Sequence, residues 1–343
     1  MKKSILITGG AGFIGSNASR HFADRGWSVT ILDSMSRTGT EKNIQWLRSC
    51  DNIRLIKHDI RDHLAVEELL DQEKPAVVLH LAAQVAVTTS VLDPKEDFLI
   101  NASATLNLLE SVREKTPETF VIFASTNKVY GQLGSIEIVE QDTRYQYKNL
   151  ANGVDESTLL DFYSPYGCSK GCADQYVHDY SRIYGIKTVV FRQSCIYGPR
   201  QFGHEDQGWV AWFTIASLLG KKVTIFGDGK QIRDLLYVDD LCEAFEKAIY
   251  RQDTISGQAF NLGGGSENTL SLMELIAKLD ELNKVPLVID WDDWRPGDQK
   301  VFVSCNSKAQ AALDWSPSVN VDDGVVRLHK WVKEHVSLFQ GLV

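Results

Sequence analysis

The chain has 343 residues, of which 43% are hydrophobic and 24% charged, and its formal net charge is -9. This length is enough for one large core or for a two-part α/β body. The negative charge argues against nucleic acid and anionic membranes as partners, but a few arginines in a cleft still attract a small anion. Six cysteines without a CxxC pair predict a reduced, cytoplasmic protein with no metal site, and no apolar run is long enough to span a membrane.

The first predicted strand, residues 4–8, leads through a glycine turn into a helix that we expect over 16–25. Gly9, Gly12 and Gly15 allow a tight turn and a close approach of backbone N–H groups to a pyrophosphate at the helix N-terminus. A glycine triplet alone can also be a packing loop. The order strand, turn, helix and strand favours dinucleotide binding.

The second predicted strand, residues 29–32, ends at Asp33, which lies 18 residues after Gly15. A carboxylate at this strand tip accepts hydrogen bonds from an adenosine ribose and repels a 2′-phosphate. NAD is therefore favoured over NADP as the cofactor, while the nearby Arg37 leaves NADP open.

Strands and helices continue to alternate along the chain. We expect further strands at 53–57, 77–81, 120–124 and 188–192, and a helix at 101–113. This alternation predicts an α/β fold with a doubly wound, Rossmann-like parallel sheet that binds ligands at the carboxyl ends of its strands. We place the NAD-binding domain at 1–192, with 235–262 returning to it, and a smaller C-terminal α/β substrate lobe at 193–343.

A tyrosine and a lysine mark the predicted chemistry. Tyr166 and Lys170 are spaced i, i+4, and Pro165 suits the first turn of a helix, so both side chains should leave one face of that helix. A lysine ammonium beside a phenol favours the phenolate, which lowers the tyrosine pKa from about 10 toward working pH and provides a general base. For this pair alone, two surface residues on an ordinary helix are the alternative interpretation.

An ordered set of motifs covers nearly the whole chain. It comprises GGAGFIG at 9–15, Asp33, Asp59, HLAAQ at 80–84, Asn101, STNKVYG at 125–131, YGCSK at 166–170, FRQSCIYGPRQF at 191–202, Arg233-Asp234 and RPGDQ at 295–299. In this set the chain resembles the extended short-chain dehydrogenase/reductase family of nucleotide-sugar-modifying enzymes. The resemblance implies that Thr126, Tyr166 and Lys170 form a Ser/Thr–Tyr–Lys catalytic triad.

The same resemblance, together with the glycine turn, implies which residues bind the ligands. The predicted NAD-binding residues are Gly9, Gly12, Phe13, Ile14, Gly15, Asp33, Ser36, Arg37, Asp59, Ile60, Leu81, Ala82, Ala83, Gln84, Asn101, Tyr166, Lys170 and Gln193. The predicted nucleotide-sugar-binding residues are Thr126, Asn127, Ser194, Gln201, Phe202, Gln207, Trp209, Thr224, Phe226, Arg233, Arg295 and Asp298. We expect Arg233 and Arg295 to bind the diphosphate, since guanidinium groups fit phosphate oxygens bidentately. The alternative interpretation of each arginine is a solvated salt bridge. For Arg295 the two interpretations are more nearly equal in weight than for Arg233.

The residues after Thr126 discriminate between reactions in this family. The 4,6-dehydratases resemble one another in carrying an Asp–Glu pair there, which eliminates water across C5 and C6, whereas this chain has Asn127-Lys128. Dehydration is therefore disfavoured. The stretches AVTTS at 86–90 and YGPRQFGHEDQGWVAWF at 197–213 are similar to those of 2-epimerases, which implies a transient 2-keto intermediate on a CDP- or GDP-linked sugar.

Three alternatives to a 2-epimerase stay open. A 4-epimerase or a net dehydrogenase would use the same site, and a non-catalytic NAD-sensing protein would use the fold alone. A sensor has no need for Thr126, Tyr166 and Lys170 together, which argues against it. By the family resemblance, the helices near 101–113 and 170–184 pair across a subunit contact, so we expect a homodimer or a homotetramer.

Overall fold

Seven parallel strands form the central sheet of the computed structural model, which describes residues 3–295 and 298–341. They are β1 (Ser4–Thr8), β2 (Ser28–Asp33), β3 (Ile53–Lys57), β4 (Val77–His80), β5 (Phe120–Thr126), β8 (Thr188–Gln193) and β12 (Gln258–Leu262). Their order is β12-β8-β5-β4-β1-β2-β3, and each neighbouring pair is parallel. The chain runs outward in opposite directions from β1 and β4, which makes the gap between their carboxyl ends a topological switch point.

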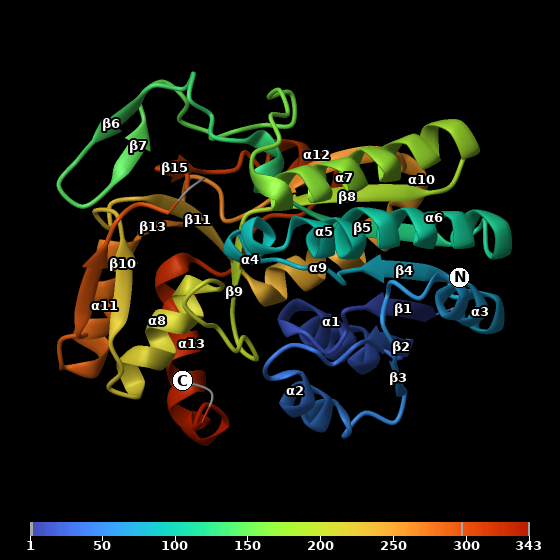
Figure 1. The fold of residues 1–343 in the computed structure, drawn as a ribbon, viewed down its shortest axis with the longest axis horizontal. Helices are drawn as coiled ribbons and strands as arrows, with labels where there is room; N and C mark the ends of the chain where they lie inside the picture. The colour runs from blue at the N-terminus through green and yellow to red at the C-terminus, as the bar shows by residue number, and fades with distance from the viewer. Residues whose placement is uncertain (1–2, 296–297, 342–343) are drawn as a thin grey trace.

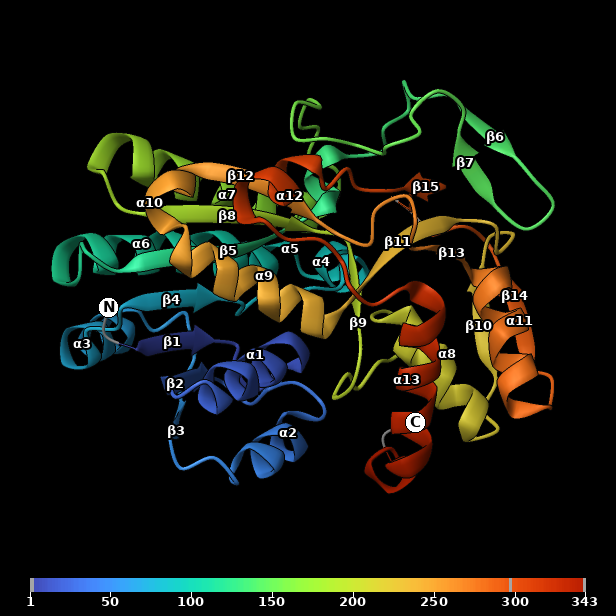
Figure 2. The ribbon, with the colours of Figure 1, turned by 180° about the vertical axis from the view of Figure 1, so that it is seen from behind.

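Helices cover both faces of this sheet (Figures 1 and 2). One face carries α3 (His63–Glu73), α6 (Ala104–Lys115) and α7 (Ser164–Tyr184), and the other carries α1 (Phe13–Asp24), α2 (Thr40–Leu47), α9 (Val238–Tyr250), α10 (Gln252–Ile255) and α12 (Ser307–Leu313). Side chains of β1 alternate between the two cores, because Ile5 and Ile7 pack with α1 and α9 whereas Leu6 packs with α3 and α6. The predicted doubly wound α/β class is thus confirmed.

Short helical segments lead from β4 to α6 and from β5 toward α7. They are α4 (Val87–Leu92), α5 (Pro94–Phe98), the π-helical turn η1 (Leu99–Ser103) and the 3-10 turn η2 (Asn127–Tyr130). The helix expected at 101–113 therefore begins inside a π turn, and the one expected at 16–25 begins earlier, at Phe13. The shorter glycine turn brings the helix N-terminus closer to β1.

The smaller lobe has its own hydrophobic core (left in Figure 1). Its strands are β9 (Cys195–Tyr197), β10 (Val223–Phe226), β11 (Ile232–Tyr237), β13 (Thr269–Ser271), β14 (Ile289–Asp292) and β15 (Val301–Phe302), and its helices are α8 (Trp209–Leu218), α11 (Leu272–Asn283), α13 (Val321–Glu334) and the 3-10 turn η3 (Val336–Leu338). Strand β11 pairs with β9, β13 and β15, while β10 pairs with β14. A capping box of Ser271 and Glu274 opens α11.

The chain passes between the two lobes more than once. After β11, α9 packs against α1 and β12 joins the edge of the large sheet, and later α12 joins the same core. In the other direction, the hairpin β6 (Ile138–Glu140) and β7 (Tyr145–Tyr147) packs against residues of β11 and β15. Within the described residues, no helix combines the length and apolar character that a membrane crossing requires.

Candidate active site

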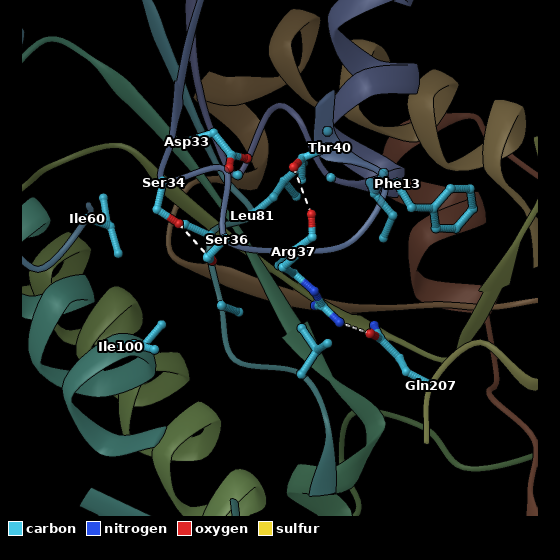
Figure 3. A pocket seen from close by; sticks show the side chains of 18 of the residues that line it. Phe13, Asp33, Ser34, Ser36, Arg37, Thr40, Ile60, Leu81, Ile100 and Gln207 are labelled. Atoms are coloured by element: carbon cyan, nitrogen blue, oxygen red, sulfur yellow. Dashed lines mark hydrogen bonds between the residues drawn. The ribbon is translucent and has the colours of Figure 1, made fainter. Parts of the chain in front are cut away.

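A cavity of about 360 Å³ lies at the carboxyl ends of β1, β2 and β4 (Figure 3). Most of the residues predicted to bind the cofactor line it: Gly9, Gly12, Phe13, Ile14, Gly15, Asp33, Ser36, Arg37, Asp59, Ile60, Leu81, Ala82, Ala83, Tyr166, Lys170 and Gln193. These residues come from separate segments of the sequence. The fold therefore gathers the predicted set around one space at the topological switch point.

Gly9 and Gly15 form one side of this cavity, here called the glycine floor, and their lack of side chains lets backbone segments pack closely there. A Cβ atom on Gly15 would lie 2.1 Å from the carbonyl oxygen of Gly9, and one on Gly9 would lie 2.8 Å from the amide nitrogen of Ala82. Gly9 also has a φ of 69°, which side chains rarely adopt. The turn after β1, the segment after β4 and the first turn of α1 consequently touch one another, and α1 begins at the cavity wall.

Asp33 is held in place at the end of β2. The amide of Ala11 donates to its Oδ2 at 3.0 Å, and the amide of Met35 donates to its Oδ1 at 2.8 Å. Burial raises the pKa of this carboxyl, and the two amide hydrogen bonds oppose that rise. The result is a fixed acceptor beside the cavity, which suits the hydroxyls of a ribose.

Three residues that line the cavity each carry a buried polar atom without a hydrogen-bond partner among the described residues. These atoms are Asn43 Oδ1, Gln193 Nε2 and Gln201 Oε1. Buried polar atoms are nearly always paired, and an unpaired one costs about 1–3 kcal/mol. A polar ligand would supply the missing partners. Together with the glycine floor and Asp33, these atoms fit a dinucleotide such as NAD.

Gln84 and Asn101 lie behind the cavity wall and not at its surface. The amide of Gln84 donates to Asn101 Oδ1 at 2.9 Å, and Asn101 Nδ2 donates back to the Gln84 carbonyl at 3.0 Å. Both side chains also bond to the buried Asp97. The cavity lining thus does not include these two predicted cofactor ligands, because their polar groups hold the segment after β4 against η1.

Several lining residues were not predicted. Arg200 reaches the cavity while its guanidinium lies 4.4 Å from the ring centroid of Trp46 and 5.5 Å from that of Trp331. Arg61 pairs with Asp59 at 2.6 Å, and also with Glu96 at 2.6 Å. Arg200 lies within a recognised motif, but no local pattern indicates that α2 and α13 would bring two tryptophans to it. For Arg61, its position two residues after the predicted ligand Asp59 was the one sequence feature that could have indicated a place in the cavity lining.

Thr126, Tyr166 and Lys170 are buried at the meeting point of β5 and α7. Thr126 is the last residue of β5, and its hydroxyl lies beside the Tyr166 phenol, whose pKa it lowers. Lys170 Nζ lies 4.2 Å from the ring centroid of Phe123 on the same strand. The helix predicted to begin near Pro165 is present from Ser164 and presents the tyrosine and the lysine to the cavity.

The predicted lowering of the tyrosine pKa is wrong for this structure. Burial raises the pKa of Tyr166 to about 12, and Asp97 adds to that rise, while the hydrogen bond from Thr126 lowers it. Burial also lowers the pKa of Lys170 to about 7, against the opposing effects of Asp174 and Asp97. The lysine is therefore only partly charged near neutral pH, which weakens its effect on the phenol.

The predicted substrate residues divide into two groups. Gln201, Phe202 and Gln207 line the cavity, and Arg37 donates to Gln207 Oε1 across it (Figure 3). The others lie outside the lining: Thr126, Asn127, Ser194, Trp209, Thr224, Phe226, Arg233, Arg295 and Asp298. The smaller lobe contributes most of this second group, on β10, α8, β11 and the segment before β15.

The side chains of the second group form ion pairs, hydrogen bonds and one cation–ring contact, several of them between distant segments. Arg233 pairs with Asp298 at 2.6 Å, and Ser194 donates to the buried carboxylate of Asp234. Arg295 lies over the ring of Phe226 at 3.7 Å and pairs with Asp206 at 3.2 Å. Asn127 Oδ1 accepts from the Thr126 hydroxyl at 3.3 Å.

The last two predicted substrate residues lie on neighbouring elements of the smaller lobe. Trp209 is the first residue of α8 and packs edge-on against Phe213. Thr224 lies on β10, where it is paired with Asp290 of β14. Pro296 and Gly297 of the RPGDQ motif lie outside the described residues.

Comparison with known proteins places this site in a family. The family model of GDP-mannose 4,6-dehydratase matches residues 6–328. CDP-paratose 2-epimerase from Salmonella typhi is 45% identical over 332 residues, which cover 95% of this chain and 98% of that protein.

Solved structures agree with the sequence comparison. UDP-glucose 4-epimerase from Thermotoga maritima, solved with UDP-glucose, has a TM-score of 0.84 at 30% identity and covers 97% of this chain and 99% of that one. The UDP-glucose 4-epimerase of Thermus thermophilus, solved as a complex with NAD, has a TM-score of 0.81 at 31% identity, with 99% and 100% covered.

The chain therefore belongs to the NAD-dependent epimerase/dehydratase family of extended short-chain dehydrogenases/reductases. The predicted family, its fold and its NAD-dependent enzyme class are confirmed. These relatives are nucleotide-sugar epimerases and dehydratases, so the chain is a nucleotide-sugar-modifying enzyme.

Proposed function

We propose that the protein is a nucleotide-sugar 2-epimerase that interconverts CDP-paratose and CDP-tyvelose. The observation that carries the reaction class is the pair Asn127-Lys128 directly after Thr126, where a dehydratase needs carboxylates. Because the carboxylate pair needed for elimination is missing, Tyr166 and Lys170 can support only the oxidation and reduction of one carbon. The 45% identity to a CDP-paratose 2-epimerase supports C2 as that carbon and CDP as the carrier.

NAD binding is supported by the glycine floor at Gly9 and Gly15, by Asp33, and by the unpaired amide nitrogen of Gln193. When bound, NAD supplies an acceptor for the hydride of C2 and a donor for its return. Since the cycle is redox-neutral, the protein can keep its cofactor between turnovers.

The chain's own residues handle the proton. In its phenolate form, Tyr166 removes the proton of the C2 hydroxyl while the C2–H bond breaks, which leaves a 2-keto sugar, and the phenol gives the proton back when the opposite face is reduced. Thr126 holds the same oxygen by a hydrogen bond. In the free protein the pKa of the phenol is raised to about 12, because burial outweighs the lowering effect of Thr126. Lys170 orients the cofactor ribose from the same face of α7.

The direct test is incubation with a panel of CDP- and GDP-linked sugars, scored for C2 configuration by NMR. We expect CDP-paratose and CDP-tyvelose to be interconverted without net NADH formation. Inversion of GDP-mannose or GDP-glucose at C2 alone would move the substrate assignment to the GDP series. Inversion at no C2 centre would overturn the proposal.

A 4-epimerase is the second candidate. The likeness to two UDP-glucose 4-epimerase structures supports it, since those chains share the fold over almost their full length. The same NMR panel separates the candidates when UDP-glucose is included, because a 4-epimerase inverts C4 and leaves C2 unchanged.

A homodimer or homotetramer is part of the proposal. Large hydrophobic side chains are exposed on α4, α5, η1 and α7: Val91, Leu92, Phe98, Leu99, Tyr176, Ile183 and Tyr184. Exposed apolar surface of this kind is typical of subunit contacts. Light scattering coupled to size-exclusion chromatography should give a mass of two or four chains, and a monomer would contradict it.

A further inference from the structure

Lys128 occupies a position to which the proposed mechanism gives no role. It lies in η2, two residues after Thr126 at the carboxyl end of β5, and its side chain is only 20% exposed. Long lysine side chains are seldom buried unless the ammonium has a partner. The partners of this ammonium therefore bear on what it does.

Lys128 and Arg233 share a single carboxylate. Arg233 lies 2.6 Å from Asp298 Oδ1, and Lys128 Nζ lies 4.0 Å from the same oxygen. The Arg233 side chain is 10% exposed, and the buried carboxylate of Asp234 next to it accepts hydrogen bonds from Ser194 and Ser304. Among the described residues, the two cations therefore pair with Asp298 alone, in a site with little water. A buried surplus charge is costly, which favours an anionic ligand that balances it.

The ammonium also has hydrogen-bonding capacity left over. Among the described residues, its hydrogen-bond acceptor is Gln299 Oε1 at 3.4 Å, a long contact for a group with three N–H donors. Arg295, the other predicted phosphate ligand, is engaged elsewhere, with Phe226 and Asp206. The cation that the fold places beside Arg233 is thus Lys128.

Building on the proposed function, we propose that Lys128 is a second diphosphate ligand beside Arg233. Its ammonium binds the sugar-bearing phosphate, because Lys128 stands two residues from Thr126, where the sugar is expected. The two cations then hold the diphosphate while the 2-keto sugar rotates in the pocket to present its opposite face. This gives Lys128 a positioning task that does not require it to exchange a proton.

The charge of this lysine should depend on pH. Burial and the neighbouring Arg233 lower the pKa of Lys128 to about 8, while Asp298 and Cys195 oppose that fall. The ammonium is present below this pH and is lost above it. Diphosphate binding should therefore weaken as the pH rises through about 8, and a bound phosphate should move the midpoint upward.

A purely structural role makes a different prediction. Gln299 Nε2 donates on its own to the carbonyl of Gly131, so the segment before β15 is tied to η2 without the lysine. A tethering lysine would affect stability and all ligands alike. A phosphate ligand would distinguish nucleoside diphosphates from monophosphates.

The test compares CMP and CDP binding by calorimetry in the wild type, Lys128→Met and Lys128→Arg. We expect Lys128→Met to lower the affinity for CDP by about tenfold or more and to leave the affinity for CMP within about twofold of the wild-type value. Lys128→Arg should restore most of the CDP affinity and abolish its dependence on pH near 8. Lys308→Met is the matched control, since Lys308 is also a partly buried lysine of lowered pKa but bonds to Ala259 on the large sheet.

Equal weakening of CMP and CDP, or none, would overturn this inference. A wild-type protein that binds neither CDP nor another nucleoside diphosphate more tightly than the monophosphate would also overturn it. If no sugar is inverted at C2 but Lys128→Met still weakens the diphosphate selectively, the proposed function fails and the ligand assignment stands. If C2 is inverted but Lys128→Met binds CDP as the wild type does, the ligand assignment fails and the proposed function stands.

Discussion

The two lobes differ in how their binding residues come together. In the large lobe, short motifs at strand ends place the groups around the cavity, as Gly9, Gly15 and Asp33 show. In the smaller lobe and its border, partners such as Lys128, Arg233 and Asp298 come from three distant segments. Motifs therefore define the cofactor half of the site, whereas tertiary packing defines the substrate half.

Replacing Tyr166 by Phe should have the largest effect. The variant keeps the ring but loses the proton-accepting oxygen, so we expect kcat to fall by about 10²- to 10⁴-fold while NAD binding is retained. Initial rates at saturating substrate measure the change. Tyr176→Phe, on the exposed face of the same helix, is the control and should keep full activity. Near-normal rates in Tyr166→Phe would remove the tyrosine from the mechanism.

Gly15→Ala should damage the cofactor half specifically. Its Cβ would meet the Gly9 carbonyl at 2.1 Å, and backbone cannot move aside cheaply. We expect a loss of about 1–3 kcal/mol in the free energy of unfolding, measured with urea, together with strongly weakened NAD binding. Gly134→Ala is the control, because a Cβ there meets nothing within 4 Å. Unchanged NAD affinity in Gly15→Ala would show that the turn is not a cofactor floor.

Asp33→Asn should change cofactor choice more than stability. The amide cannot repel a 2′-phosphate and is a weaker acceptor for a ribose, so the preference for NAD over NADP should fall by about tenfold or more. Calorimetric titration with both cofactors measures this ratio. Asp24→Asn, which alters an exposed partner of Arg20, should leave the ratio as it is. The assignment is contradicted if both variants keep the wild-type preference.

Arg200→Ala should have the smallest effect, at the border of the two lobes. It removes a guanidinium that lies near Trp46 of α2 and Trp331 of α13, contacts worth about 0.5–1 kcal/mol each. Thermal unfolding should show a modest loss of stability, and Arg48→Ala, at an exposed position after α2, should show less. Equal unfolding temperatures for the two variants would mean that the stacking does not join the lobes.

The sequence was informative where function follows from local pattern. The strand ends, the glycine turn and the i, i+4 spacing of Tyr166 and Lys170 all depend on neighbours in the chain. The strands end within two residues of the expected positions, and the helix after the glycine turn begins three residues earlier than expected. Gln84 and Asn101 lie outside the cavity lining and bond to each other, so their place in the cofactor site stays a prediction. Nothing in a local pattern separates a residue that binds the ligand from one that bonds within the chain.

Electrostatics was the least predictable property. The spacing of Tyr166 and Lys170 indicated a lowered tyrosine pKa, but the depth of burial, which follows from packing, reverses the direction. The same holds for Lys128, whose shared carboxylate comes from a segment 170 residues further along the chain. A sequence gives the identity of charged groups, while their energies depend on what surrounds them.

The central claim is that one carbon is oxidised and reduced within a single closed cycle. Substrate labelled with deuterium at C2 tests it most directly, with the product analysed by NMR and mass spectrometry in ordinary water. A closed cycle predicts that the deuterium stays at C2 of the inverted sugar, since the same hydride returns. Loss of the label to solvent would contradict it and point to proton abstraction from carbon.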